Sequence, residues 1–253
     1  MNAFNALAAE LLKLRRSAVW VVVVILPLLS VITGTVNFVM NAGVLDNEWD
    51  SYWSQVTLFY GLIFASVGVA VLCSAMWRME HLGNWPRLMA GPTSTGAIVG
   101  AKLGALAVLV AAMQAALFVF AWIAGVVFAG MPLAIPVRFA VGAVVAALAS
   151  LSVAALHSFI SMLVRSFAAP VAVAVLGCVV GVGLLLSGAS QAVSSLIPYT
   201  LVTRALSLGS SAFADSAALS WAEVARVAVP SLFLALVLTV LAAAVLDRCE
   251  VKG

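Results

Sequence analysis

The chain has 253 residues, of which 65% are hydrophobic and 8% charged, and its formal net charge is +3. A water-soluble protein of this length needs a polar surface that so few charged residues cannot supply, so the composition excludes a soluble globular domain. The apolar residues also fall in long runs, which predicts a membrane protein with no room for a separate catalytic domain.

Six apolar segments are long enough to cross a bilayer, which takes about 20 helical residues. They cover residues 18–39, 56–77, 101–128, 139–164, 168–187 and 224–246. The connections between them are short. We therefore predict an all-α polytopic membrane protein in which residues 1–253 form a single transmembrane domain.

The segment before the first span, residues 2–16, carries Phe4, Leu7 and Leu11 at the spacing of one helical face. Glu10 lies largely off that face, as does Lys13 one turn later. This pattern predicts an amphipathic helix that lies along the membrane surface. Such a helix serves either as a simple anchor or as a lever that touches a cytoplasmic partner, and the pattern leaves both open.

Basic residues are divided unequally between the two ends of the predicted spans. With the N-terminus in the cytoplasm, nine lie inside (Lys13, Arg15, Arg16, Arg78, Arg87, Lys102, Arg165, Arg248 and Lys252) and three outside (Arg138, Arg204 and Arg226). Lys and Arg accumulate on the cytoplasmic side of membrane proteins. We therefore predict that both termini are cytoplasmic, and the Ala- and Gly-rich composition points to the cytoplasmic membrane of a bacterium.

Charge, Trp, Pro and Gly are concentrated in residues 78–100, between the second and third spans. Pro86 can begin a helical turn, a Gly-Pro pair can end it, and Thr93 or Ser94 can cap the next helix. We predict a short helix over residues 85–90 on the cytoplasmic surface.

About 36 residues, 188–223, separate the fifth and sixth spans. They are moderately apolar, but glycines, Pro198 and polar residues interrupt them too often for a seventh span. We predict re-entrant or surface helices on the outer face, with bends at Gly188 and Pro198.

Chemistry-bearing residues are scarce within the spans. No Asp or Glu lies near the middle of any span, which argues against a proton-coupled transporter or a cation channel. Gln114 and His157 are polar, and each can line a pathway or form a hydrogen bond between helices. No G-x-S-x-G, H-E-x-x-H or G-x-x-x-x-G-K-[ST] motif occurs. We therefore expect no catalytic residue, no metal site, no bound cofactor and no nucleic-acid partner.

The second span is followed by Glu80-x-x-Gly83-x-Trp85-x-x-Leu88, then by a Gly-Pro-Thr-Ser run and Lys102. An amphipathic first helix precedes this motif, and a large outer segment precedes the last span. The pattern resembles the permease subunits of type 2 ATP-binding-cassette (ABC) exporters. It is most similar to the lantibiotic and bacteriocin immunity permeases and the multidrug export permeases.

The resemblance implies a half-transporter. Two permease chains, identical or related, would enclose the path, and two copies of a separate cytoplasmic ATPase would bind ATP and Mg²⁺. By the same resemblance, the residues that contact the ATPase would be Glu80, His81, Trp85, Arg87 and Leu88, with Glu10 and Lys13 nearby. A solvated loop with an interfacial Trp remains the alternative for this segment.

The apolar spans favour a hydrophobic or amphipathic substrate, such as a peptide antibiotic, a lantibiotic or a drug. A second hypothesis is export of a polysaccharide or lipid-linked glycan, which would stack on aromatic residues such as Phe118, Phe120 and Trp122. A third is a membrane scaffold or sensor that transports nothing.

Overall fold

A computed structural model describes residues 3–83, 85, 93–188, 190–208 and 220–250. The described residues are mainly helical and contain no strand, and six helical segments are long and apolar enough to cross a membrane. The predicted class, an all-α polytopic membrane protein, is confirmed.

The helices follow one another along the chain with short connections. They are α1 (Ala3–Leu14), α2 (Val19–Met40), α3 (Trp49–Phe59), the π-helix η1 (Tyr60–Phe64), α4 (Ala65–His81), α6 (Thr95–Phe128), α7 (Val137–Leu163), α8 (Ala168–Leu186), α9 (Gln191–Ser195), α10 (Pro198–Ser207) and α11 (Trp221–Glu250). The second span is continuous through α3, η1 and α4.

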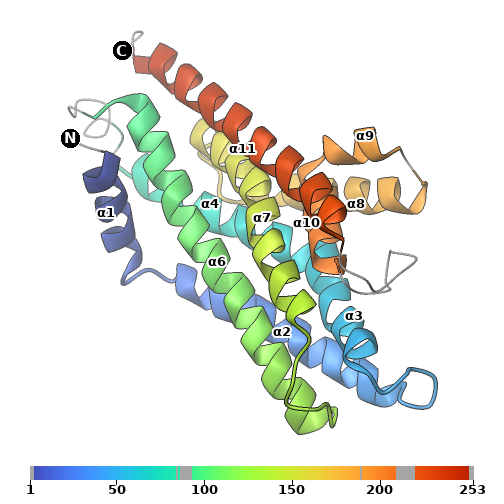
Figure 1. The fold of residues 1–253 in the computed structure, drawn as a ribbon. Helices are drawn as coiled ribbons and strands as arrows, with labels where there is room; N and C mark the ends of the chain where they lie inside the picture. The colour runs from blue at the N-terminus through green and yellow to red at the C-terminus, as the bar shows by residue number, and fades with distance from the viewer. Residues whose placement is uncertain (1–2, 84, 86–92, 189, 209–219, 251–253) are drawn as a thin grey trace.

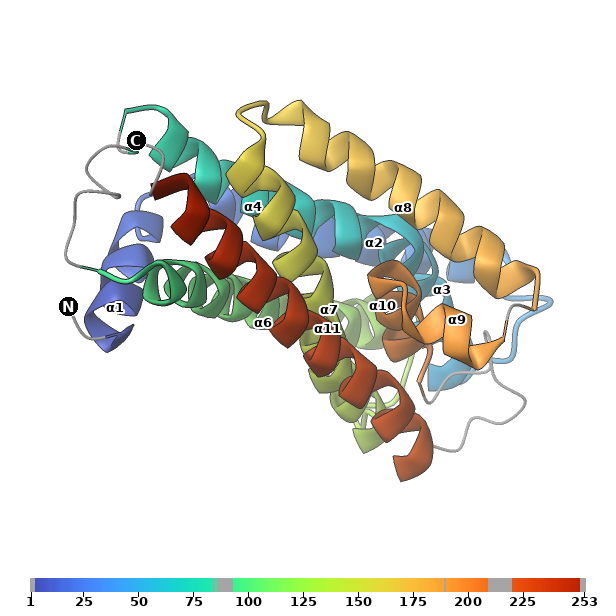
Figure 2. The same ribbon diagram turned by 90° about the horizontal axis from the view of Figure 1, so that it is seen from above.

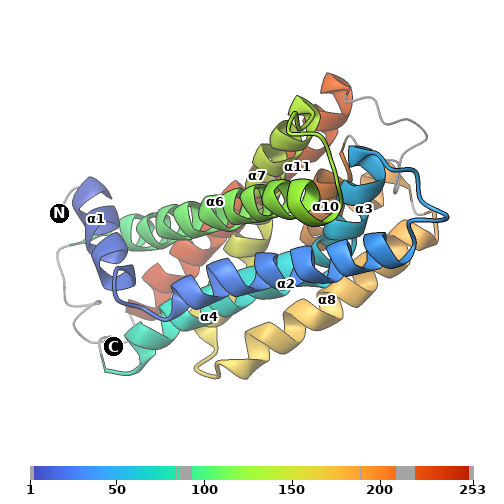
Figure 3. The same ribbon diagram turned by 90° about the horizontal axis from the view of Figure 1, so that it is seen from below.

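The bundle has two ends (Figures 1 and 3). At one end, called here the N-terminal end, α1 lies near the end of α4, the start of α6 and the end of α11. The connections from α2 to α3 and from α6 to α7 lie at the opposite end, called here the distal end. Seen from above, α7 lies in the middle of the bundle, and α8 lies at its edge (Figure 2).

Two spans are longer than the apolar runs indicated. The second begins at Trp49 rather than residue 56, and the third at Thr95 rather than residue 101. The second is extended because Tyr52 and Trp53 are buried against neighbouring helices, although polar residues flank the pair on both sides. The helix also continues to His81, so the first residues of the predicted loop 78–100 belong to α4 and that prediction is corrected.

Small residues let the helices approach closely. The buried face of α7 is rich in Ala and Ser, including Ala146, Ala149 and Ser150, which suits close helix packing within membranes. On α2, a Cβ added at Gly34 would lie 2.5 Å from the Cα of Val56. The backbones of α2 and α3 can therefore meet only because this residue is glycine.

The segment between the fifth and sixth spans contains α9 and α10 in its described part. Gly188 has φ +66° and Pro198 is the first residue of α10, so both predicted bends are observed. Most of α10 is buried, and it packs against α7, α8 and η1. Tyr199, near its start, bonds to His157 on α7, whereas its last residues lie beside Gly142 near the distal start of α7. The helix therefore runs between the spans toward the distal end. That this segment is re-entrant or lies on the outer face stays a prediction.

The packing face of α1 differs from the predicted apolar face. Ala6, Glu10 and Leu14 are buried against the bundle, whereas Phe4 and Leu12 are 78% and 69% exposed. The prediction that Glu10 lies away from the apolar contacts is wrong, because a buried lysine on α6 holds its carboxylate inside.

Candidate functional site

Four charged side chains from three helices meet at the N-terminal end, and we call them the ion-pair cluster: Glu10, Lys13, Glu80 and Lys102. Lys13 Nζ lies 2.7 Å from Glu10 Oε1 and 2.7 Å from Glu80 Oε1. Lys102 Nζ lies 3.0 Å from Glu10 Oε2 and 2.9 Å from Glu80 Oε1. Each ammonium therefore donates to both carboxylates, and α1, α4 and α6 are joined through one set of charges.

The cluster is neutral in sum and largely buried. The side chain of Lys102 is fully buried and that of Glu80 is 2% exposed. Burying an ion is costly unless opposite charges and hydrogen bonds replace its water, and here two acids face two bases. For Lys13, burial alone would lower the pKa of the ammonium, but hydrogen bonds to Glu10 and Glu80 and their negative charges outweigh burial and raise its pKa.

An aromatic layer continues the cluster across the bundle. Lys102 Nζ lies 5.0 Å from the ring centroid of Trp77, a cation–π distance. Trp77 Nε1 donates to Ser158 Oγ on α7 at 2.7 Å. The His81 ring stacks on Trp85, with centroids 5.2 Å apart and an interplanar angle of 11°. We call Trp77, His81 and Trp85 the aromatic cluster.

His81 is fixed to α7 as well. Its Nε2 lies 2.9 Å from the carbonyl oxygen of Ser161, and because a carbonyl only accepts, Nε2 carries the proton of this bond. The two clusters therefore connect α1, α6, α4 and α7 without a break, and a displacement at this end reaches four helices.

The structure brings together five of the seven residues expected to contact an ATPase. Glu10, Lys13 and Glu80 meet in the ion-pair cluster, and His81 and Trp85 stack beside it. Arg87 and Leu88 lie outside the described residues, as does most of the predicted helix 85–90. The predicted cap is observed, since Ser94 Oγ accepts from the backbone N–H of Ala97.

Burial divides these residues by role. Within this chain the carboxylates of Glu10 and Glu80 have almost no exposed surface, and they bond to lysines rather than facing outward. His81 and Trp85 are only half-buried, and the side chain of Lys13 is 36% exposed. Of these five residues, the aromatic pair and Lys13 therefore have surface open to a partner, and the carboxylates lie behind them.

A family model described as "ABC-2 family transporter protein" matches residues 6–181, which is more than half of the chain.

The chain belongs to the ABC-2 transporter family.

The matched region holds both clusters and the first four spans. No match was found among curated proteins or among solved structures. As an ABC-2 family member, the chain is the membrane component of an ABC transporter, and such a transporter has an ATPase partner.

The role of Lys102 in this ABC-2 permease was not predicted from the sequence. The sequence analysis placed Lys102 at the inner end of the third span and gave it no partner. A lysine set among Gly, Ala and Leu near the start of an apolar helix requires a buried partner, which was a signal that could have been used. The partners themselves, at positions 10 and 80, could not be assigned without the fold.

The two polar residues predicted within the spans have different surroundings. His157 Nε2 lies 2.9 Å from the hydroxyl of Tyr199, which joins α7 to α10. Gln114 is buried beside the hydroxyl of Tyr60, and among the described residues its amide forms no hydrogen bond of ordinary distance and angle. A bond between helices is therefore observed for His157 and not for Gln114.

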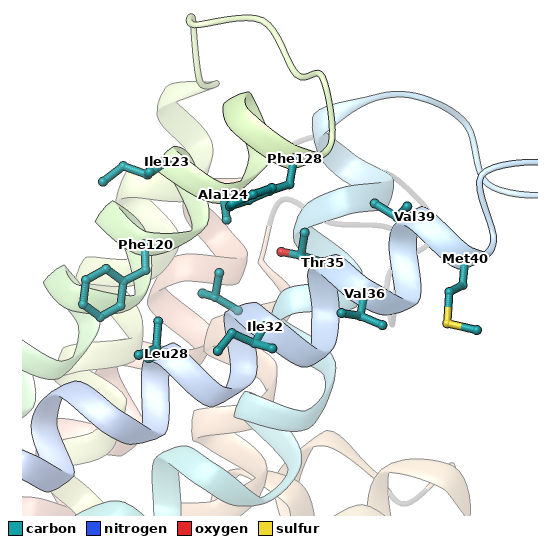
Figure 4. Close-up of a pocket in the computed structure, with 11 residues that line it drawn as sticks. Leu28, Ile32, Thr35, Val36, Val39, Met40, Phe120, Ile123, Ala124 and Phe128 are labelled. Atoms are coloured by element: carbon teal, nitrogen blue, oxygen red, sulfur yellow. The ribbon is translucent and has the colours of Figure 1, made fainter.

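A cavity of about 600 Å³ lies between the distal halves of α2 and α6 (Figure 4). Leu28, Ile32 and Val36 of α2 face Phe120 and Ala124 of α6 across it.

Hydrogen-bonding groups are scarce in the lining of this cavity. Thr35 supplies its one side-chain hydroxyl, which is already bonded to the hydroxyl of Tyr52 at 2.9 Å. The volume falls within the roughly 300–1,000 Å³ of small-molecule sites. The cavity suits an apolar group and offers little to a sugar.

Proposed function

We propose that this chain is the permease subunit of an ABC exporter that moves hydrophobic or amphipathic compounds, such as peptide antibiotics, lantibiotics or drugs. A separate ATPase subunit would bind ATP and Mg²⁺ and drive transport. Two permease chains, identical or related, and two ATPase copies would form the complete transporter. Family membership supports the transporter class, and the buried ion-pair cluster is the observation that carries the coupling role.

The proposed orientation places the N-terminal end in the cytoplasm of a bacterium, with both termini inside. Support comes from the excess of Lys and Arg at this end and from the position of α1. The exposed Phe4 and Leu12 side chains of α1 would enter the lipid interface, as expected of an amphipathic surface helix.

The coupling proposal follows from rigidity. A partner that pushes on His81 and Trp85 acts on side chains that are tied to α7 and lie directly beside the ion-pair cluster. Since that cluster joins α1, α4 and α6, the push moves these helices together. Trp85 and His81 supply the aromatic contact area, and Lys13 the charge, that an ATPase surface would recognise.

The apolar cavity between α2 and α6 supports an apolar substrate over a glycan. The three aromatic residues expected to stack on a glycan, Phe118, Phe120 and Trp122, do not form one stacking surface. Phe118 packs on Trp53 in the interior, Phe120 lines the cavity, and Trp122 Nε1 donates to the carbonyl oxygen of Leu133. A sugar would meet isolated aromatic rings, whereas a hydrophobic compound would contact the continuous apolar lining of the cavity.

The test is retention of the ATPase. Full-length permease purified from its native membranes is expected to bring an ABC ATPase with it, at about one copy per permease chain. The double variant His81→Ala/Trp85→Ala should lose that ATPase and ATP-driven efflux while keeping wild-type helical content. Trp221→Ala is the control, because Trp221 is 76% exposed and begins α11, whose opposite end is the one at the N-terminal end of the bundle. Retention of the ATPase by the double variant would refute the coupling surface, and its absence from the wild-type preparation would refute the exporter.

A further inference from the structure

Two arginines without an acidic partner face one crevice at the N-terminal end. Arg78, in the last turn of α4, and Arg165, between α7 and α8, line it together with His81. None of its described lining residues is acidic. The ion pairs found within the described part of the chain involve neither arginine.

The fold holds both guanidinium groups near this crevice. Arg78 lies over the ring of Phe167, 5.8 Å from its centroid. Arg165 stands in the turn of four residues that joins two spans, and it also lines an adjoining cavity of about 270 Å³ beside His81. The crevice itself is too narrow to hold a water molecule, but both arginines are exposed at its mouth. Two like charges there repel each other, and an anion at the mouth of the crevice would relieve that repulsion.

The backbone adds a donor to the same place. The N-terminus of α8 begins directly after this turn, and the first N–H groups of a helix have no partner within it. Ser166 Oγ accepts from the N–H of Ala169, and Pro170 has no N–H, so Ala168 is the residue at the start of α8 whose N–H is left for an anion. Arginine forks and a helix N-terminus both bind phosphate well.

The surroundings of the crevice are apolar toward the membrane. Leu163 at the end of α7 is 52% exposed, and on α8 the outward side chains Val173 and Leu176 are 41% and 65% exposed. A ligand that puts an anionic group on the arginines therefore meets an apolar face beside it. Basic pockets between spans at the cytoplasmic surface bind anionic lipid head groups in this way.

We propose that Arg78 and Arg165 bind the phosphate of an anionic glycerophospholipid whose acyl chains lie along α8. The site is separate from the surface proposed to contact the ATPase, apart from His81, which borders both. The shared chemistry is a phosphate group, and the experiment distinguishes a lipid phosphate from a soluble one.

The purified full chain in detergent would be mixed with phosphatidylglycerol or with phosphatidylcholine of the same acyl chains, and native mass spectrometry would count the lipid retained. Wild type should prefer phosphatidylglycerol. The double variant Arg78→Gln/Arg165→Gln should lose that preference by about fivefold for each arginine, the effect typical of a basic side chain at an anionic membrane surface. Arg165→Lys, which keeps the charge but not the fork, should lose less.

The matched control is Arg15→Gln/Arg16→Gln, which removes the same charge from exposed residues at the same end but outside the crevice. It should keep the wild-type preference. Circular dichroism must show wild-type helicity for both doubles, and Arg165→Lys carries the test if the crevice double fails to fold.

Several outcomes would overturn the site. Wild type could show no preference, or both doubles could lose it equally. Displacement of phosphatidylglycerol by millimolar inorganic phosphate alone would assign the site to a soluble phosphate. Loss of the ATPase from the crevice double, with lipid preference unchanged, would assign the arginines to a protein contact.

Discussion

The contact between Gly177 of α8 and Tyr199 of α10 gives the sharpest test of how α10 is held against the spans. A Cβ added at Gly177 would lie 2.1 Å from Tyr199 Cε2 and 2.2 Å from Cζ. Carbon atoms in ordinary contact are about 3.5–4.0 Å apart. The ring would therefore have to move by about 1.5 Å, which would break its 2.9 Å hydrogen bond to His157.

Three contributions set the expected change in the free energy of unfolding for Gly177→Ala. Overpacking a tight interior costs about 1–3 kcal/mol, and the lost buried hydrogen bond adds about 1 kcal/mol. Replacing Gly by Ala within a helix stabilises the helix by about 1 kcal/mol and so offsets part of this loss. The net loss in the free energy of unfolding is about 1–3 kcal/mol, which corresponds to a fall in Tm of roughly 2–12 °C for a chain of this size.

Gly183→Ala on the same helix is the matched control, because nothing lies within 4 Å of a Cβ at that position. Thermal unfolding in detergent should show no loss for Gly183→Ala and a clear loss for Gly177→Ala. In a Tyr199→Ala background the cost of Gly177→Ala should disappear, since the two residues are in contact. Equal melting of the two alanine variants, or a cost that persists without the tyrosine ring, would refute the reasoning.

Three further outcomes are expected. Lys102→Met leaves two buried carboxylates with one lysine, so it should lower the free energy of unfolding by about 3–5 kcal/mol, and wild-type melting would contradict a buried cluster. Gly34→Ala places a Cβ 2.5 Å from the backbone of Val56, so it should destabilise more than Gly100→Ala, which meets nothing within 4 Å; equal melting of the two would argue against the close crossing. The pKa of Lys13 is raised above its ordinary 10.5, so its stabilisation of α1 should be complete below that pH and be lost only as pH rises through the raised pKa. A spin label on α1 would detect the release, and release well below pH 10.5 would contradict the assignment.

Features set by local sequence were predictable. The six spans follow from runs of about 20 apolar residues, and the membrane interior is the environment that accommodates six such runs in one short chain. The cap at Ser94 and the bends at Gly188 and Pro198 follow from residue types with narrow backbone preferences. Each of these depends on a few neighbouring residues, so the sequence contains the information directly.

The candidate site was predictable only in part. Glu10, Glu80 and Trp85 were recognised as related through their family pattern, but their surroundings were not. Residues 10, 80 and 102 are far apart along the chain, and their pairing depends on how α1 packs against α6. The π-helix η1 was also missed, because its wider turn leaves no signal in the spacing of apolar residues. Contacts between distant segments therefore decided the ion-pair cluster.

The second span contacts both of the features on which the proposed mechanism depends. At the N-terminal end, Glu80 and His81 of α4 belong to the two clusters. About 30 Å away along the same helix, at 1.5 Å per residue, the carbonyl oxygen of Gly61 in η1 accepts a hydrogen bond from Thr203 of α10 at 2.8 Å. A π-helical turn is a weaker point in a helix than the regular turns beside it, and such turns recur at functional sites. A displacement that enters at His81 would therefore have a stiff path along α4 and a place to bend at η1, where α10 is attached.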